Sequence, residues 1–294
     1  MRLDAILKPI AKDLDSVLRG LRERLERLVT RQTAAGALAG LEIGSVTHLF
    51  SSPGKLIRPA LVLLSSRGAM PEGPVSETPR AVVDLGIAAE LVHSASLVHD
   101  DIVDKAESRR DLPSVNQLYG NAAAVLAGDV LYAEFFMTLL GLPGIGWVER
   151  GDLFRRFAET TQRMCVGEML AQRIVSSGSA ASLGEYLAIA QRKTAELMSV
   201  CCAGGAIVRG APTAVVDALG EFGLAFGMAF QLVDDALDGD ALLAEDSDAT
   251  GRAREYGRRA LGSIEGLPGN AGLDGLRELC GYVLARGEAG MDRL

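Results

Sequence analysis

Most of the chain consists of long stretches in which apolar residues recur every three or four positions, separated by short polar segments. In the first stretch these residues run from Leu3 to Leu28. This spacing is typical of an amphipathic helix, because residues three and four apart lie on the same helical face. Pro9 interrupts the stretch, so we predict that the helix is kinked or restarts there.

The same pattern predicts helices along the rest of the chain. They cover residues 57–67, 81–104, 121–140, 152–172, 183–208 and 214–238, followed by two weaker helices separated by the turn segment LPGNAG. The second and third of them are apolar nearly all round, which is typical of helices inside a bundle. In the helix 214–238, Gly220, Gly223 and Gly227 are expected to let a neighbouring helix approach closely.

No stretch shows the sustained alternation of apolar and polar residues that marks a β-strand. We therefore predict an all-α fold, in which residues 1–294 form a single domain built as one large helix bundle. Hydrophobic residues make up 48% of the chain, which is ample for a sizeable core. The formal net charge of −8 argues against a surface that binds nucleic acid.

The cysteines and the N-terminal segment bear on the cellular compartment. None of the four cysteines forms a C-x-x-C pair, which favours a reducing, cytoplasmic environment. The N-terminal segment carries charges throughout, unlike a signal peptide. The apolar run 121–142 contains Asp129 and Glu134, so we expect no transmembrane segment.

Two acidic motifs with the same D-D-x-x-D spacing each end an apolar helix. The first aspartate motif lies in LVHDDIVD and the second in QLVDDALD, and their members are Asp100, Asp101 and Asp104, and Asp234, Asp235 and Asp238. Residues four apart share a helical face, so the carboxylates of one motif repel each other unless a cation lies among them. All-oxygen ligands of this kind favour Mg²⁺, which also takes water and substrate phosphate as ligands.

A single motif of this kind is as often an exposed helix end as a metal site. Two identical motifs behind buried helices favour the metal site. We therefore predict that both motifs hold a cluster of Mg²⁺ ions, which bridges two helices through a phosphorylated ligand. His99, directly before Asp100, is expected to support or cap the first motif.

An anionic ligand also needs positive charge from the protein. Lys55 and Arg58 lie three apart in GKLIRP, at the start of a predicted helix, where backbone N–H groups also favour anions. Arg109 and Arg110 follow the first aspartate motif, and Lys193 lies in an otherwise apolar helix. A single cation is usually a solvated surface charge. Five of them near acidic motifs, in a chain that is acidic overall, favour a diphosphate ligand.

Six segments between Gly54 and Asp238 carry these residues: GKLIRP, LVHDDIVDKAESRR, GNAAAVLAGD, GEMLAQ, KTAELM and FGMAFQLVDDALD. In sequence and in order they resemble the motifs of the trans-isoprenyl diphosphate synthases, or polyprenyl synthetases. One of them alone would be a weak signal, whereas six in sequence are specific. The resemblance implies a helix bundle of the isoprenoid synthase type, with a central cavity for the prenyl chain.

The resemblance also implies a prenyltransferase that condenses isopentenyl diphosphate with an allylic prenyl diphosphate, with Mg²⁺ as cofactor and as a homodimer. Isopentenyl diphosphate is expected at Lys55, Arg58, His93 and Arg110. The allylic diphosphate is expected at Arg109, Lys193, Thr194 and Gln231, the last three as catalytic residues that stabilise the departing diphosphate. The six aspartates are expected as metal ligands.

Product length is implied by the residues one turn before the first aspartate motif, Ala95 and Ser96. In the family, aromatic residues here close the tunnel for the prenyl chain and small residues leave it open. The chain therefore resembles long-chain synthases such as octaprenyl diphosphate synthases, whose products become quinone side chains. Phe135 or Phe136 is a candidate for the tunnel floor and Phe230 for a contact with the prenyl chain, although packing is the commoner role of each.

The chain departs from the family pattern at two places. Asp111 stands where the family has glycine, a mild change because aspartate also tolerates turn geometry. After Asp238 the family carries a segment that supplies a further lysine, an aspartate and part of a lid, whereas here Asp238 is followed by GDALLAEDSDATGRAREYGRRA. Either the natural protein lacks this segment, or the sequence as given omits a mobile stretch.

Three other interpretations fit the same helical fold. A non-catalytic regulatory subunit of a hetero-oligomeric prenyl synthase would explain the missing segment, but not the intact aspartate motifs and GKLIRP. A terpene cyclase needs no isopentenyl site, so Lys55 and Arg58 argue against it. A purely structural bundle would make six ordered motifs a coincidence. Exact product length, the allylic primer and homo- versus hetero-oligomerisation stay open.

Overall fold

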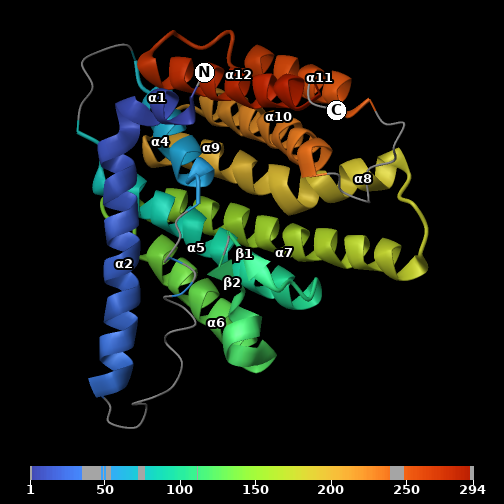
Figure 1. Ribbon diagram of the computed structural model, residues 1–294. Helices are drawn as coiled ribbons and strands as arrows, with labels where there is room; N and C mark the ends of the chain where they lie inside the picture. The colour runs from blue at the N-terminus through green and yellow to red at the C-terminus, as the bar shows by residue number, and fades with distance from the viewer. Residues whose placement is uncertain are drawn as a thin grey trace. The chain divides into compact units, whose positions relative to one another are not determined.

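The computed structural model describes residues 2–34, 48, 50, 54–71, 77–110, 112–238 and 248–291. The helices are α1 (Leu3–Leu7), η1 (Lys8–Ile10), α2 (Ala11–Ala34), α4 (Ile57–Gly68), α5 (Arg80–Val103), α6 (Val115–Leu140), α7 (Trp147–Ser177), α8 (Leu183–Ala190), η2 (Gln191–Ala195), α9 (Glu196–Val208), α10 (Thr213–Asp238), α11 (Ala249–Ser263) and α12 (Ala271–Met291). The only strands in these ranges, β1 (Ser108–Arg109) and β2 (Leu112–Pro113), pair antiparallel. The all-α prediction is confirmed (Figure 1).

The predicted helices are present, and the structure adds detail at three points. The restart near Pro9 is confirmed, since α1 passes through a 3₁₀ turn before α2. The spacing predicts a helix from Asn121, whereas α6 begins at Val115 and contains Gly120 with φ +81°. Only glycine takes this φ readily. Gly120 therefore joins the predicted helix to residues 115–119, for which the apolar pattern predicts no helix. The predicted helix 183–208 contains a π-helical turn, η2.

The chain forms two compact units. Unit 1 comprises Met1–Ala11, Ala60–Glu77 and Ile145–Leu294, and unit 2 comprises Lys12–Pro59 and Thr78–Gly144. Unit 2 contains the first three of the six motif segments, including the first aspartate motif. Unit 1 contains the other three, including the second aspartate motif. The expectation of a single domain stays a prediction.

In unit 2, α5 packs against α6 and α2 packs against α5. Close packing of α2 on α5 depends on Gly20, where an added Cβ would lie 2.6 Å from Cδ1 of Ile87. A charged cluster joins the same helices, because Arg24 on α2 pairs with Asp84 at 3.2 Å and with Glu134 at 3.3 Å. Asp84 is buried and also pairs with Arg80. We call these four residues the Arg24 cluster.

In unit 1, α10 lies between α9 on one side and α11 and α12 on the other (Figure 1). Gly223 and Gly227 bring α10 against its neighbour, because an added Cβ would lie 2.5 Å from the carbonyl oxygen of Met198 and from Cα of Ala195, respectively. The prediction of close approach is confirmed for these two glycines. It is wrong for Gly220, where the nearest atom would lie at 3.5 Å, an ordinary contact.

By length and apolar composition alone, three described helices could cross a membrane: α5, α6 and α10. The most apolar window of α5 is 83% buried inside the protein, and those of α6 and α10 are 44% and 56% buried. The expectation of no transmembrane segment stays a prediction.

Candidate functional site

The first aspartate motif lies at the C-terminal end of α5 in unit 2. Asp104 directly follows the helix with helical φ and ψ, and its backbone N–H donates to the carbonyl of Asp100 at 2.8 Å. Asp100 and Asp104 therefore keep the spacing of one helical turn. Asp100 is half-buried, Asp101 is 1% exposed and Asp104 is exposed.

Asp101 is held by an arginine from the short β-hairpin. Nε of Arg109 donates to Oδ1 of Asp101 at 2.9 Å, and the guanidinium also forms an ion pair with this oxygen. The other oxygen, Oδ2, is buried and has no hydrogen-bond partner among the described residues. A buried carboxylate oxygen in this state needs a compensating cation or water. The hairpin thus places Arg109 at the first aspartate motif, and Oδ2 is suited to a cation.

The second aspartate motif repeats this arrangement at the C-terminal end of α10 in unit 1. Asp234 is half-buried, Asp235 is 7% exposed and Asp238 is exposed. Nε2 of Gln231 donates to Oδ1 of Asp235 at 2.6 Å, and the hydroxyl of Tyr186 donates to its Oδ2 at 2.5 Å. In both motifs the middle aspartate is buried and held, and the outer two lie one turn apart.

The π-turn η2 brings Thr194 to Gln231, beside the second aspartate motif, and Lys193 to Glu168. The hydroxyl of Thr194 donates to Oε1 of Gln231 at 2.5 Å. The ammonium group of Lys193 forms an ion pair with Glu168 on α7. Gly167 allows this approach, because an added Cβ would lie 2.8 Å from Cβ of Arg192. π-Turns are rare and occur often at functional sites. The segments GEMLAQ, KTAELM and QLVDDALD therefore meet within unit 1.

Unit 2 brings together the cations predicted for isopentenyl diphosphate. Nη1 of Arg58 lies 3.0 Å from Nε2 of His93. Because a guanidinium only donates, Nε2 accepts this bond and His93 is neutral with its proton on Nδ1. Arg110 lies beside Gly54, where an added Cβ would be 2.5 Å from Nη2 of Arg110. Lys55 is exposed next to them in sequence.

Burial shifts the pKa values of two groups on the same stretch of α5. The pKa of His93 lies well below its usual value, first because of burial and then because of the positive charges of Arg58, Arg110 and Arg109. The pKa of Glu90, one turn earlier, is raised by burial, although Arg58 and Arg110 oppose this shift. Burial is the first cause of both shifts, whereas the positive charges add to the shift of His93 and oppose that of Glu90.

The backbone around these cations is strained. Leu56, Lys105 and Arg110 have φ values of 52°, 53° and 52°, and they are the only non-glycine residues with positive φ in the described part of the chain. Such values cost energy for residues with a Cβ and cluster at functional sites. Leu56 lies within GKLIRP, Lys105 directly follows Asp104, and Arg110 directly follows β1.

His99 is anchored to α6. Its Nε2 donates to the carbonyl of Val125 at 3.1 Å, and its ring packs against Tyr132. Gly128 makes room, since an added Cβ would lie 2.2 Å from Nε2 of His99. His99 therefore supports the end of α5 by packing on the segment GNAAAVLAGD.

Three residues at these sites carry no role in the sequence-based interpretation. Glu168 lies in GEMLAQ, four residues before Gln172, which donates a hydrogen bond to it. This spacing is the one sign in the sequence that Glu168 has a partner on its own helix. Glu90 is a charged residue in an apolar helix, three positions before His93. A charged residue is rarely buried without a partner, so its position in the sequence is a recognisable sign of a functional role. Tyr186 has no such sign, because its partner Asp235 lies 49 residues away.

Other predicted positions are found as follows. Ala95 is fully buried, and Ser96 donates to the carbonyl of His93 at 2.9 Å. Phe135 is fully buried against Phe136, and Phe230 packs on Phe226. Asp111 and residues 239–247, where the family segment is missing, lie outside the described residues. The roles of these positions stay predictions, as does the bridging of both aspartate motifs by one ligand.

The carboxylates suit Mg²⁺ bound together with a substrate. Among the described residues, no three carboxylate, imidazole or thiol side chains converge to form a cage of protein ligands alone. Mg²⁺ usually uses one or two carboxylates and completes its shell with water and phosphate oxygens. The outer aspartates of each motif, one turn apart, match this requirement.

Lowering the pH is expected to destabilise the protein in part through His93. The imidazole has a pKa near 6.5 when unfolded and a lower one when folded. The unfolded state therefore binds this proton first as the pH falls. The stability that neutral His93 supports is complete above pH ~6.5 and decreases progressively below it.

The measurement is urea unfolding of the wild type and His93→Gln between pH 7.5 and 5. The unfolding free energy of the variant should decrease less steeply as the pH falls. His48→Gln, which removes a half-buried imidazole, is the control. Equal slopes for wild type and His93→Gln would contradict the prediction.

The architecture and the paired carboxylate sites define an all-α protein of the isoprenoid synthase class. The crystal structure of a polyprenyl synthase from Caulobacter crescentus, complexed with calcium and isoprenyl diphosphate, matches with a TM-score of 0.80 and 24% identity. The match covers 97% of this chain and 98% of that chain, and it shows a shared fold. The Polyprenyl synthetase family model matches residues 43–253. The chain belongs to the polyprenyl synthetase family.

Curated relatives agree with this assignment. A prenyl transferase of Synechocystis sp. is 39% identical over 227 residues, which cover 76% of this chain and 65% of that protein. A (2E,6E)-farnesyl diphosphate synthase of Mycobacterium bovis is 38% identical over 184 residues, covering 63% of this chain and 48% of that protein. The chain thus spans about half to two thirds of the length of the relatives it matches.

Proposed function

We propose that the protein is a Mg²⁺-dependent trans-polyprenyl diphosphate synthase, which condenses isopentenyl diphosphate with an allylic prenyl diphosphate. Membership of the polyprenyl synthetase family supports prenyl transfer as the general activity. The observation that carries the proposal is the repeated arrangement of the two aspartate motifs. Each has a buried central aspartate held by protein donors and outer aspartates one turn apart. Each also has an arginine of its own unit beside it, Arg109 at Asp101 and Arg286 at Asp234.

Asp100 and Asp104 of the first motif and Asp234 and Asp238 of the second would hold Mg²⁺. The buried Oδ2 of Asp101 is a further ligand atom at the first motif. When bound, Mg²⁺ polarises the phosphate oxygens and neutralises the diphosphate as it leaves. The calcium and isoprenyl diphosphate in the Caulobacter structure support this combination of cation and substrate.

Lys193, Thr194 and Gln231 act on the allylic substrate. Its C–O bond breaks, and the electron pair leaves with the diphosphate. Negative charge grows on the diphosphate in this step, so a cation fixed in advance stabilises the transition state more than the ground state. The ion pair with Glu168 holds the ammonium group of Lys193 in place before the substrate arrives. Thr194 orients Gln231 through their hydrogen bond.

The unit 2 cations bind the second substrate. Arg58 and Arg110 offer guanidinium groups to the diphosphate of isopentenyl diphosphate, with Lys55 at the exposed edge. Neutral His93 keeps Arg58 oriented by accepting its hydrogen bond. The double bond of isopentenyl diphosphate attacks the allylic cation and a C–C bond forms. A proton is then lost to the departed diphosphate, which restores a double bond.

Incubation of the purified protein with Mg²⁺, farnesyl diphosphate and labelled isopentenyl diphosphate tests the proposal. Chromatography of the products should show a ladder of prenyl diphosphates longer than the primer. Omission of Mg²⁺ with EDTA present should abolish the ladder. Absence of elongation with geranyl, farnesyl and geranylgeranyl primers alike would reject the proposed activity.

The product is proposed to be long, in the hexaprenyl-to-decaprenyl range, and to supply quinone side chains. Ala95 and Ser96 have small side chains at the positions expected to line the tunnel. A larger side chain at this point of α5 would occupy space that the growing prenyl chain needs.

Ala95→Phe is therefore expected to shorten the products by at least one isoprene unit without abolishing elongation. The comparison uses product chromatography at equal substrate concentrations. Ala88→Val, a buried α5 position about two turns earlier, is a control for general disturbance of the helix. An unchanged product distribution in Ala95→Phe would contradict the tunnel assignment.

The protein is proposed to act as a cytoplasmic homodimer. A stripe of exposed side chains follows one face of α6 at steps of three and four, and it consists of Leu126, Val130, Ala133, Met137 and Leu140. Leu126 and Met137 are each 64% exposed. Contiguous apolar surface of this kind marks an interface more often than free surface.

Met137→Asp is expected to shift the protein from dimer to monomer, because it places a charge in the apolar stripe. Light scattering after size-exclusion chromatography measures the mass directly. Glu107→Lys, an exposed charged residue away from the stripe, is the control. A dimer that persists in Met137→Asp at micromolar concentration would contradict the assignment of this interface.

A further inference from the structure

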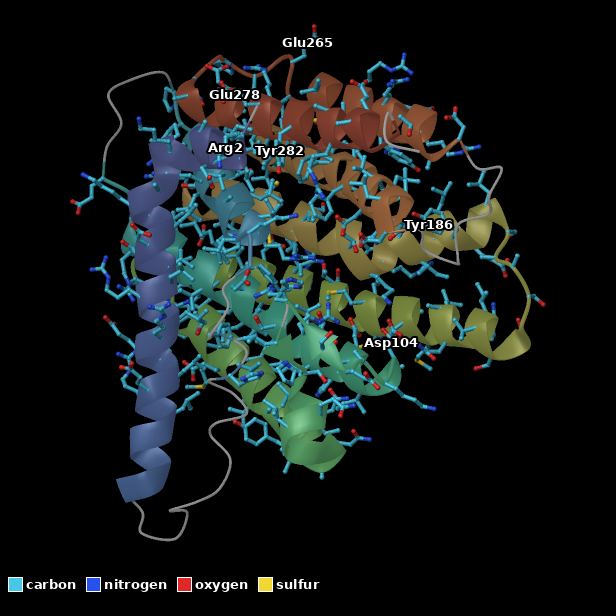
Figure 2. The ribbon with its side chains drawn as sticks, in the orientation of Figure 1. Arg2, Asp104, Tyr186, Glu265, Glu278 and Tyr282 are labelled. Carbon is cyan, nitrogen blue, oxygen red and sulfur yellow. The ribbon has the colours of Figure 1, made fainter. Side chains whose placement is uncertain are left out.

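Tyr186 contacts the second aspartate motif from another helix. Its hydroxyl, on α8, donates a hydrogen bond of 2.5 Å to Oδ2 of Asp235 on α10, and Figure 2 labels Tyr186. Tyr186 is 4% exposed and Asp235 is 7% exposed. A buried carboxylate is costly unless donors compensate its charge. Hydrogen bonds to a charged acceptor are shorter and stronger than neutral ones.

The other oxygen of Asp235 is held from a second direction. Gln231 donates to Oδ1 at 2.6 Å, and Thr194 in turn donates to Gln231 at 2.5 Å. Thr194 thus holds Gln231, and Gln231 and Tyr186 each donate to one oxygen of Asp235. The bond between Gln231 and Asp235 lies within α10, so the bond from Tyr186 on α8 is the one that fixes the rotation of the last turn of α10 at Asp235.

The outer aspartates depend on that rotation. Asp234 precedes Asp235 on the same turn, and Asp238 ends α10. The last turn of a helix has carbonyl groups without intrahelical partners, so it is held less firmly than the interior. Asp235 is the buried residue of this turn, and its contacts set the rotation from which Asp234 and Asp238 project. Asp234 also pairs with Arg286 on α12 at 3.7 Å.

We propose that Tyr186 is a positioning residue of the second aspartate motif. Its hydroxyl fixes Asp235, and thereby holds Asp234 and Asp238 in the orientation that receives a divalent cation with a diphosphate ligand. This rests on the proposed function for the identity of that ligand. Tyr186 touches neither substrate nor cation, and it acts only through Asp235.

The plainer interpretation is that Tyr186 is a core residue whose hydroxyl has found a partner, as buried tyrosine hydroxyls usually do. The two interpretations differ in what the loss of the hydroxyl changes. A core role affects thermal stability alone. A positioning role affects the affinity for the divalent cation, and excess cation should compensate for it.

Tyr186→Phe removes only the hydroxyl. Mn²⁺ binding in the presence of inorganic pyrophosphate is measured from the EPR signal of the free ion, without turnover. We expect the affinity to fall by about 10–100-fold, the usual effect of losing a group that orients a metal ligand. In the elongation assay, kcat should fall at low Mg²⁺ and recover at high Mg²⁺. KM for isopentenyl diphosphate, whose proposed residues are in unit 2, should stay unchanged.

Tyr282→Phe on α12 is the matched control, since it removes a tyrosine hydroxyl elsewhere in unit 1 (Figure 2). It should leave Mn²⁺ affinity unchanged. Adding Tyr186→Phe to Asp234→Asn should cause little further loss of Mn²⁺ affinity, because the two changes act on the same cation site.

Unchanged Mn²⁺ affinity in Tyr186→Phe would overturn the inference, and so would the same loss of affinity in the Asp234→Asn background. An effect on melting temperature alone would assign Tyr186 to the core and also overturn it. A wild type that binds Mn²⁺ with pyrophosphate but elongates no primer would reject the proposed activity and leave the Tyr186 result valid. The two failures are thus distinguishable.

Discussion

Replacement of Lys193 by glutamine is expected to lower kcat by about 10²–10³-fold. Loss of one preorganised group that stabilises developing charge typically has an effect of this size. The glutamine keeps much of the length of the side chain but cannot compensate the charge of the leaving diphosphate. KM for isopentenyl diphosphate should change little, because its proposed residues, Lys55, Arg58, His93 and Arg110, are in unit 2. Steady-state kinetics with labelled isopentenyl diphosphate measure both quantities.

Arg192→Gln is the matched control for this result. Arg192 is the neighbouring cation in the same π-turn, but its guanidinium donates to the carbonyl of Ala188. Its loss should change kcat less than threefold. Lys193→Arg keeps the positive charge and should recover part of the activity. If Lys193→Gln and Arg192→Gln had equal kcat values, Lys193 would have no specific role in stabilising the diphosphate.

Replacement of Arg24 by alanine is expected to destabilise the protein by about 3 kcal/mol, because it leaves buried carboxylates without their partner. The side chains of Asp84 and Glu134 are 7% and 15% exposed, so water replaces the guanidinium poorly. Arg80 continues to pair with Asp84, which is why we expect the lower end of the usual range. Urea unfolding at pH 7 gives the free energy directly.

Arg22→Ala is the control for the Arg24 cluster. Arg22 is exposed on the same helix, so its loss should change the unfolding free energy by no more than about 0.5 kcal/mol. A second variant, Arg24→Ala with Glu134→Gln, removes the unpaired charge on α6 and should regain part of the loss. A change of less than about 1 kcal/mol in Arg24→Ala would show that the cluster is solvated in solution.

Periodicity and local spacing predict much of this molecule. The helices follow from apolar residues at steps of three and four, and the restart at Pro9 follows from proline chemistry. Both aspartate motifs end helices, as their position behind apolar runs predicts. The pairing of Arg58 with His93 joins two residues that the resemblance assigns to one substrate.

The remainder depends on contacts that no local pattern records. The π-turn at Gln191–Ala195 leaves the apolar periodicity almost unchanged, so the sequence predicts a continuous helix there. Gly220 has the same spacing as Gly223 and Gly227, yet only the latter two meet a backbone. The bond between Tyr186 and Asp235 joins α8 to α10, and it becomes visible only when their side chains are placed in space.

The π-turn has a consequence for how this chain tolerates insertions and deletions. Each residue of an α-helix turns the chain by about 100°. Deletion of one residue within Gln191–Ala195 would convert the widened turn into regular helix and favour the backbone locally. Deletion of Gln191 or Arg192 would also shorten the spacing between Tyr186 and Lys193 by one residue, and so change the relative direction of these two side chains around the helix axis. A shorter and more regular helix would thus form easily, but it could not place Tyr186 at Asp235 and Lys193 at Glu168 at the same time.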